Sequence, residues 1–281
     1  MATLASALFA AAFFTGPALA AAEVVIKHQS WTFSGPFGTY DNQQLQRGYQ
    51  IYREVCSGCH SMNYVSFRNL YEKGGPEFSE DEVKALAAQF EVIDGPNEDG
   101  DMFERPARPS DRFPAPFANA AAAKASNNGA LPPDFSLIAK ARAVSRGFPT
   151  FVFDIFTQYQ EGGPDYIYSL LTGYAEGSDT EPNDEGVYAN HSFIAGKAIA
   201  MAPPLSDELV AYAQNGDEDP DNDLPETVDQ YAMDVVSFLM WAAEPHLEAR
   251  KAMGLKVMIF LFIFAGLLFY SKKKVWAGIA H

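Results

Sequence analysis

Two cysteines separated by two residues and followed at once by a histidine form the most chemically distinctive cluster in this chain of 281 residues. They are Cys56, Cys59 and His60. A C-x-x-C-H run is the attachment signature of a c-type haem, because the thiols lie one helical turn apart and can both add to vinyl groups on one porphyrin edge. The adjacent imidazole can then ligate the iron. The spacing therefore predicts one covalently bound haem c.

Other uses of a cysteine pair fit this sequence less well. A redox-active dithiol normally follows a strand in a βαβ unit, and no such pattern surrounds residue 56. A structural zinc ion needs four ligands, yet the chain has only two cysteines. A disulfide between Cys56 and Cys59 would close a loop too short to stabilise the fold much. Haem attachment is the interpretation that the pattern favours.

The second axial position of such an iron separates electron transfer from ligand chemistry. We favour Met201, because two prolines follow it at positions 203 and 204 and stiffen the backbone that would present the thioether. His191 is the rival, since haems with two axial histidines exist. A sulfur ligand opposite imidazole raises the reduction potential, whereas a second imidazole lowers it.

Both ends of the chain are hydrophobic. Residues 1–20 are small and apolar and end in Ala18-Leu19-Ala20, which matches a cleavage site of exported proteins. No basic residue precedes Lys27, so the positive start that is usual in such segments is missing. We expect residues 1–20 to be a signal peptide. An N-terminal membrane helix is the alternative, which Gly16 and Pro17 disfavour.

Residues 252–270 carry a single charge, Lys256, and would form about 28 Å of helix, close to the hydrocarbon thickness of about 30 Å. Three lysines follow at 272–274, and the positive-inside rule places that end in the cytoplasm. A buried core helix is the alternative, but core helices rarely end in a lysine cluster. We therefore expect a periplasmic domain at 21–250, and at 251–281 a transmembrane anchor with a short cytoplasmic tail.

Charge is distributed unevenly. Five of the 20 lysines and arginines lie after residue 250, where there is no acid, so the first 250 residues combine 15 basic with 36 acidic side chains. The acids gather at 77–104, 176–185 and 217–229. So negative a domain disfavours binding to nucleic acid and favours cationic partners, although solvated surface loops would have the same composition.

The sequence between the hydrophobic ends predicts a mainly α fold with long irregular loops. Asp41 can cap a first helix, Ser79 with Glu82 and Thr227 with Gln230 form capping boxes, and Pro245 separates the last two helices. The expected helices cover about 43–56, 80–90, 135–144, 165–172 and 228–243. Residues 91–133 and 175–190 are expected to be extended connections, which are unusual in a compact domain unless they serve a function.

Several motifs together resemble the cytochrome c1 family, the haem subunit of the cytochrome bc1 complex. Besides the haem motif they are NNGALPPD at 127–134 followed by KAR at 140–142, GGPDYIYSLLTGY at 162–174, IAMAPPL at 199–205, and FLMWAAEP at 238–245 leading into the C-terminal anchor. They occur in the order that is typical of the family and extend from about residue 30 to the end of the chain.

The resemblance implies specific roles around the haem. Cys56 and Cys59 would form thioethers, and His60 and Met201 would be the axial ligands of the iron. Arg142 would face a haem propionate and Tyr166 would pack beside the ring. The loop that contains Pro132 and Pro133 would line the pocket and exclude water.

The resemblance also implies a function. The chain would be the electron-transfer subunit of a ubiquinol–cytochrome c oxidoreductase in a bacterial inner membrane, beside cytochrome b and the Rieske iron–sulfur protein in a dimeric complex. It would accept electrons from the Rieske protein and pass them to a soluble basic cytochrome c, without bond-making catalysis of its own. The alternative is a membrane-anchored haem enzyme or gas sensor with an open sixth coordination site.

Overall fold

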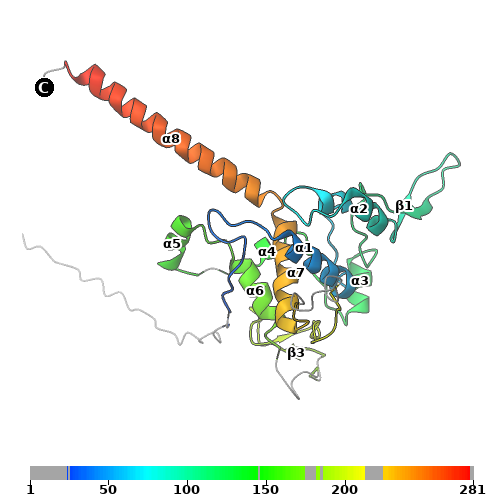
Figure 1. Cartoon of the computed structure of the whole chain (residues 1–281). Helices are drawn as coiled ribbons and strands as arrows, with labels where there is room; N and C mark the ends of the chain where they lie inside the picture. Colours follow the sequence, from blue (N-terminus) through cyan, green and yellow to red (C-terminus); the bar gives the residue numbers. More distant parts are fainter. Residues whose placement is uncertain are drawn as a thin grey trace, which may run out of the picture.

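The computed structural model describes residues 24, 26–144, 146–174, 182–183, 186–212 and 224–278. The expected signal peptide at 1–20 lies outside these residues, as do most of the acidic segments at 176–185 and 217–229. The mainly helical fold class is confirmed, with a helical domain and one long C-terminal helix that projects from it (Figure 1).

Two helices from opposite ends of the sequence form the centre of the domain. Helix α1 (Asn42–Ile51) packs along α7 (Val228–Ala243). A Cβ on Gly48 would lie only 2.2 Å from the backbone oxygen of Asp234, so glycine is required for the two backbones to approach this closely. Leu45 and Phe238 are fully buried on the facing sides. Helices α1 and α7, which are far apart in the sequence, thus share one core.

An ion pair lies inside this α1–α7 contact. Arg47 donates to the Asp234 carboxylate from Nε at 2.8 Å and from an Nη at 3.3 Å. Tyr212 and Gln230 donate to the same carboxylate at 2.8 and 2.9 Å. Because a buried charge is costly unless it is paired and hydrogen-bonded, this network makes the register between α1 and α7 specific.

Two shorter helices pack on another side of α7. They are α4 (Ile138–Ala141) and α6 (Gly162–Leu171). A Cβ on Gly163 would lie 1.7 Å from the Ala139 carbonyl oxygen, so α6 and α4 also touch through a glycine. Pro164 lies in the first turn of α6, where the missing N–H leaves no intrahelical bond unmade.

The capping predictions are confirmed at two of three helices. Asp41 accepts from the Gln44 backbone at the start of α1, and Ser79 forms a reciprocal capping box with Glu82 at the start of α2 (Glu80–Ala87). At α7, Thr227 accepts from the Gln230 backbone, but the Gln230 side chain donates to Asp234 instead of returning to the cap. The expected box is therefore only half formed.

Two expectations about regular structure were wrong, and one helix was not predicted at all. Residues 91–133 are not a continuous extended connection, because they contain a hairpin of β1 (Glu91–Asp94) and β2 (Phe103–Pro106), paired from Glu91 with Pro106, and helix α3 (Ala120–Ser126). The helix expected at 135–144 is reduced to the four residues of α4. Helix α5 (Thr150–Thr157) was not expected.

Three further elements complete the described part. The π-helix Tyr52–Cys56 continues α1, the 3-10 helix Phe67–Tyr71 precedes α2, and a short hairpin joins β3 (Tyr188–Ala189) to β4 (Ala198–Ile199).

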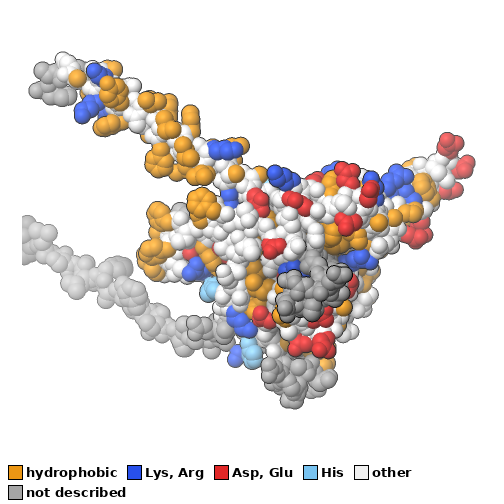
Figure 2. All heavy atoms as spheres, in the orientation of Figure 1, with side chains coloured by type: hydrophobic (Ala, Val, Ile, Leu, Met, Phe, Trp, Pro, Cys, Tyr) orange, Lys and Arg blue, Asp and Glu red, His pale blue; other side chains and the backbone are white. Residues whose placement is uncertain are grey.

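Helix α8 (Leu247–Trp276) begins after the break at Pro245 and contains the expected span at 252–270. It is long and apolar enough to cross a membrane, and none of its most hydrophobic stretch is buried within the protein. Figure 2 shows its hydrophobic side chains exposed along the whole rod. A helix whose apolar side chains face outward on all sides needs an apolar surrounding, so α8 fits a single-pass membrane anchor.

The Arg47–Asp234 pair yields a stability prediction. Replacing Arg47 by Met leaves the Asp234 carboxylate buried without its cation, which we expect to lower the free energy of unfolding by about 3 kcal/mol. The measurement is the denaturation midpoint of the purified protein, followed by circular dichroism. Lys84→Met is the control: its partner Asp81 is exposed, so a change below about 0.5 kcal/mol is expected. Equal effects of the two substitutions would contradict the assignment.

Candidate haem site

The C-x-x-C-H motif lies where α1 changes its winding. The π-helix that extends α1 ends at Cys56, and the next turn is closed by backbone hydrogen bonds from Cys59 N at 3.1 Å and His60 N at 2.9 Å, both to the Cys56 carbonyl oxygen. Ser57 Oγ donates to the Arg53 carbonyl at 2.7 Å. π-helical turns are frequent at functional sites. Here the turn holds two thiols and an imidazole within five residues.

The two thiols differ in environment. Cys56 is half-buried and Cys59 is exposed. Burial, and to a smaller extent the neighbouring Cys59, raises the pKa of Cys56 to about 12, so its sulfur is a neutral thiol at physiological pH. Within the described residues no group of three or more His, Cys, Asp or Glu side chains could hold a metal ion. The zinc interpretation therefore gains no further ligand from the tertiary structure.

The His60 imidazole is held at one of its two nitrogens. Nδ1 lies 2.8 Å from the Pro133 carbonyl oxygen, which can only accept, so Nδ1 carries the proton and Nε2 has the free lone pair. The ring stacks on Phe135 with centroids 3.9 Å apart and planes 17° from parallel. Burial lowers the pKa of His60, although the bond to Pro133 opposes this. A neutral, oriented imidazole with Nε2 available is the form that binds iron.

Asp134 attaches the Pro133 segment to the haem motif. Its carboxylate accepts from Ser61 Oγ at 2.8 Å and from the Asn63 and Ser136 backbones, both at 2.9 Å. Phe135 N donates to the Ser61 carbonyl oxygen at 2.8 Å. Burial alone would raise the pKa of Asp134, but these hydrogen bonds outweigh it and hold the pKa below its usual value. These bonds hold residues 134–136 against the haem motif, and the helix expected over 135–144 begins only at Ile138.

Arg142 and Tyr166 lie close enough for the charge of Arg142 to act on the Tyr166 hydroxyl. Arg142 follows the last residue of α4 and is exposed, and Tyr166 lies in α6 and is buried. Burial raises the pKa of Tyr166, while a hydrogen bond with the Ile194 backbone and the charge of Arg142 act in the opposite direction. The contact between α4 and α6 thus brings these two predicted residues together.

Met201 follows β4 in a hairpin that docks on the end of α6. Its carbonyl oxygen accepts from the Tyr174 hydroxyl at 3.0 Å, and its side chain is half-buried. Asn190 Nδ2 donates to the Leu170 carbonyl at 2.9 Å, and His191 N to that of Gly173 at 3.0 Å. The rival ligand His191 is itself exposed.

The predicted site residues therefore form two groups. Cys56, Cys59 and His60 share one turn, whereas Arg142, Tyr166 and Met201 are arranged around α6. Residues 133–142 connect them, since this segment bonds His60 at one end and carries Arg142 at the other. The donor set fits a covalently attached haem, because it offers paired thiols beside an imidazole whose Nε2 is unengaged.

Sequence reasoning missed two residues of this site, Asp134 and Phe135. The proline pair before them marks a rigid loop, but neither the carboxylate bonds of Asp134 nor the stacking of Phe135 on His60 has a signal in local sequence, because both partners lie more than 70 positions away. A surface hollow of about 380 Å³ lies elsewhere, and none of the predicted site residues lines it.

Comparison with known proteins gives a consistent result. The model of the "Cytochrome C1 family" matches residues 31–279. The chain is 54% identical over 251 residues to a "Cytochrome b/c1" of Bradyrhizobium diazoefficiens, covering 88% of this chain but 35% of that protein. It is 46% identical to a "Cytochrome c1" of Blastochloris viridis, covering 89% of this chain and 86% of the relative. It is 41% identical to the "Cytochrome c1 1, heme protein, mitochondrial" of Arabidopsis thaliana, covering 88% and 71%.

Asp134 is expected to position the histidine loop. Replacing Asp134 by Asn should lower the free energy of unfolding by about 1–3 kcal/mol, because Ser61 and the Asn63 backbone lose a charged acceptor. Since the folded-state pKa is depressed, this contribution is present above the ordinary value of 3.8 and is lost as the pH falls through the folded-state pKa. Unfolding midpoints of the wild type and the variant should converge in that acidic range.

The control for this substitution is Glu104→Gln, an exposed carboxylate on β2. It should leave the unfolding midpoint and its pH dependence unchanged. A gap between wild type and Asp134→Asn that stayed constant down to pH 2 would contradict the role of the ionised carboxylate.

Proposed function

Because this chain belongs to the cytochrome c1 family, whose members are haem c proteins and subunits of the cytochrome bc1 complex, we propose that it passes electrons from a Rieske iron–sulfur protein to a soluble cytochrome c. The observation that carries this proposal is the C-x-x-C-H turn with its imidazole fixed through Nδ1. The reaction of the complex would be ubiquinol oxidation coupled to cytochrome c reduction. This subunit would contribute electron transfer and no bond-making catalysis.

The haem is proposed to be held by four side chains. Cys56 and Cys59 would form the thioether links, and His60 Nε2 and the Met201 sulfur would ligate the iron. Bound haem c supplies a reversible one-electron couple between ferrous and ferric iron. The Pro133 carbonyl fixes the His60 tautomer and increases its basicity, and the hydrogen bond from Tyr174 to the Met201 backbone supports the segment that presents the sulfur.

Two further residues are proposed to act on the periphery of the haem. Arg142 is exposed, and no hydrogen bond or ion pair involves its side chain within the described residues, so its guanidinium is available to pair with a propionate. Tyr166 is buried next to it and would pack beside the ring. The loop that contains Pro132 and Pro133 would exclude water from the pocket, which helps to keep the reorganisation on electron transfer small.

The chain is proposed to sit in a bacterial inner membrane with its haem domain in the periplasm. Helix α8 supports a single-pass anchor, and the lysines at 272–274 support a cytoplasmic C-terminus by the positive-inside rule. Such an anchor would place the haem beside cytochrome b and within reach of the Rieske protein, in a complex that we take to be dimeric.

The electron acceptor is proposed to be a basic cytochrome c. The chain carries a formal net charge of −16. In the described part, exposed acids gather on the β1–β2 hairpin, where Figure 2 shows a red tip that projects from the domain; they are Glu91, Glu98, Asp99, Asp101 and Glu104. Such a surface attracts a cationic partner and raises the encounter rate.

The ligand assignment is tested by replacing Met201 with Leu. We expect loss of the weak red absorption band that methionine–ferric iron ligation gives, and a lower reduction potential, because the soft sulfur that stabilises ferrous iron is removed. Met102→Leu is the matched control, since Met102 is exposed and should leave both properties unchanged. Persistence of the band in Met201→Leu would overturn the assignment. A wild-type spectrum that lacks the band, together with a spectrum that changes in His191→Leu, would favour the rival. An already open sixth position in the wild type would favour a haem enzyme or gas sensor.

Electrostatic steering predicts a strong salt dependence. The bimolecular rate constant for reduction of a basic soluble cytochrome c by the purified complex should fall steeply as ionic strength rises from about 0.01 to 0.15 M, because the Debye length shrinks from about 30 to about 8 Å. Stopped-flow absorbance measures this rate. An acidic acceptor cytochrome is the control and should show the opposite trend. A rate constant for the basic partner that does not change with ionic strength would contradict electrostatic steering.

A further inference from the structure

Helix α5 and the residue pair before it expose a dense aromatic patch. Phe148, Phe151, Phe153 and Phe156 expose 83%, 49%, 64% and 81% of their surface. We call these four residues the phenylalanine patch. None of the α5 side chains that the structure describes is buried, so the helix does not serve the core of the domain. Clustered exposed aromatic side chains mark a contact with a partner or a membrane.

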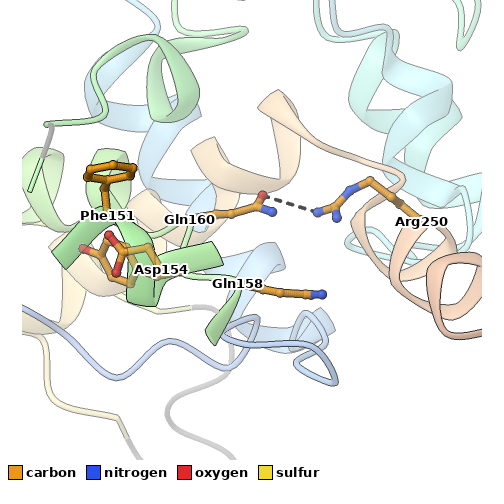
Figure 3. Close-up of a pocket in the computed structure, with 6 residues that line it drawn as sticks. Phe151, Asp154, Gln158, Gln160 and Arg250 are labelled. Atoms are coloured by element: carbon orange, nitrogen blue, oxygen red, sulfur yellow. Dashed lines mark hydrogen bonds between the residues drawn. The ribbon is translucent and has the colours of Figure 1, made fainter. Parts of the chain in front are cut away.

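The phenylalanine patch lies next to the point where α8 leaves the domain. A surface hollow of about 380 Å³ is lined by Phe151, Asp154, Gln158, Tyr159, Gln160 and Arg250 (Figure 3). Gln160 Oε1 accepts from Arg250 at 3.4 Å and from Lys140 at 2.8 Å. Arg250 belongs to the start of α8 and stands two residues before its apolar span. In Figure 2 hydrophobic side chains gather on the side of the domain that faces the base of α8.

The charge around the phenylalanine patch also differs from that of the rest of the domain. Asp154 is the only acid between residues 135 and 160, where there are three bases, Lys140, Arg142 and Arg146. Asp154 is paired with Arg146 at 2.8 Å, and Arg146 lies over the Tyr159 ring at 4.3 Å. Lys140 and Arg250 are likewise paired, both with Glu244. The charges of this region are therefore close to balanced, whereas the chain as a whole carries a net charge of −16, so an anionic lipid surface would repel it less than the rest of the domain.

We propose that α5, with Phe148, is a second membrane contact, inserted into the interfacial layer of the bilayer beside the N-terminal end of α8. The continuity with the apolar span of α8, the aromatic composition and the absence of a strong local negative charge among the described residues all fit a lipid surface. Two membrane contacts instead of one would restrict how the haem domain tilts over the bilayer. The proposal rests on α8 spanning the membrane.

Photochemical labelling in native membranes tests the proposal. In the haem-loaded protein both natural cysteines are used for attachment, so Phe153→Cys introduces one reactive thiol for a benzophenone maleimide. Illumination of isolated membranes, purification of the chain and mass spectrometry then identify what lies against residue 153. We expect a phospholipid adduct, at a yield several-fold above that of Ile93→Cys. Ile93 is the matched control, because it is also exposed (70%) but lies on the β1 strand.

The outcomes separate the proposal from its premise. Phe262→Cys, in the middle of α8, must give a lipid adduct if α8 spans the membrane. A lipid adduct at 262 but none at 153 overturns the second contact alone. An adduct at 153 with another protein subunit or with a second copy of this chain also overturns it, because the patch is then a protein interface. If Phe153→Cys fails to bind haem, Phe156→Cys applies the same test from the other end of α5.

Discussion

The hydrogen bond between His60 Nδ1 and the Pro133 carbonyl oxygen, at 2.8 Å, connects two segments that are 73 positions apart. It decides which imidazole nitrogen is free, and so it leaves Nε2 as the atom that the proposed iron ligation would use. Asp134 keeps Pro133 in place by accepting hydrogen bonds from both sides of the contact. A bond to a backbone carbonyl is well suited to this purpose, because that oxygen cannot donate and does not titrate near neutral pH.

The rest of the domain supplies rigidity around this contact. The π-turn that carries the cysteines extends α1, and α1 is held against α7 by the closely approaching Gly48 and by the buried Arg47–Asp234 pair. Residues 133–142 lead into α4, which touches both α6 and α7. The hairpin that carries Met201 docks on the end of α6. The proposed ligands from residues 60 and 201 therefore belong to segments that are packed, through α1 and α6 respectively, on one central helix.

Two features of the chain bear on its contact with a membrane, and the hydrophobic signal of α8 is stronger than that of the phenylalanine patch. Helix α8 is apolar on every side, so its need for an apolar surrounding follows from composition alone. The phenylalanine patch is short. From the sequence alone, its four aromatic side chains could equally well belong to a helix that is buried in the protein core. Only the exposure of these side chains and the position of Arg250 beside them distinguish a surface contact from a core helix.

The sequence by itself determined the haem motif, the helical class, the three predicted N-cap residues and the long apolar C-terminal helix, because each depends on residues close together in the chain. Local pattern did not determine the length of the helix after Pro133, since the segment before it is held by contacts with Ser61 and Asn63, which are distant in the sequence. Nor did it show the β1–β2 hairpin, whose strands are only half-buried and lack clear alternation. The tautomer of His60, the partner of Asp234 and the exposure of α5 were decided by tertiary structure, because each depends on atoms that distant parts of the chain bring together.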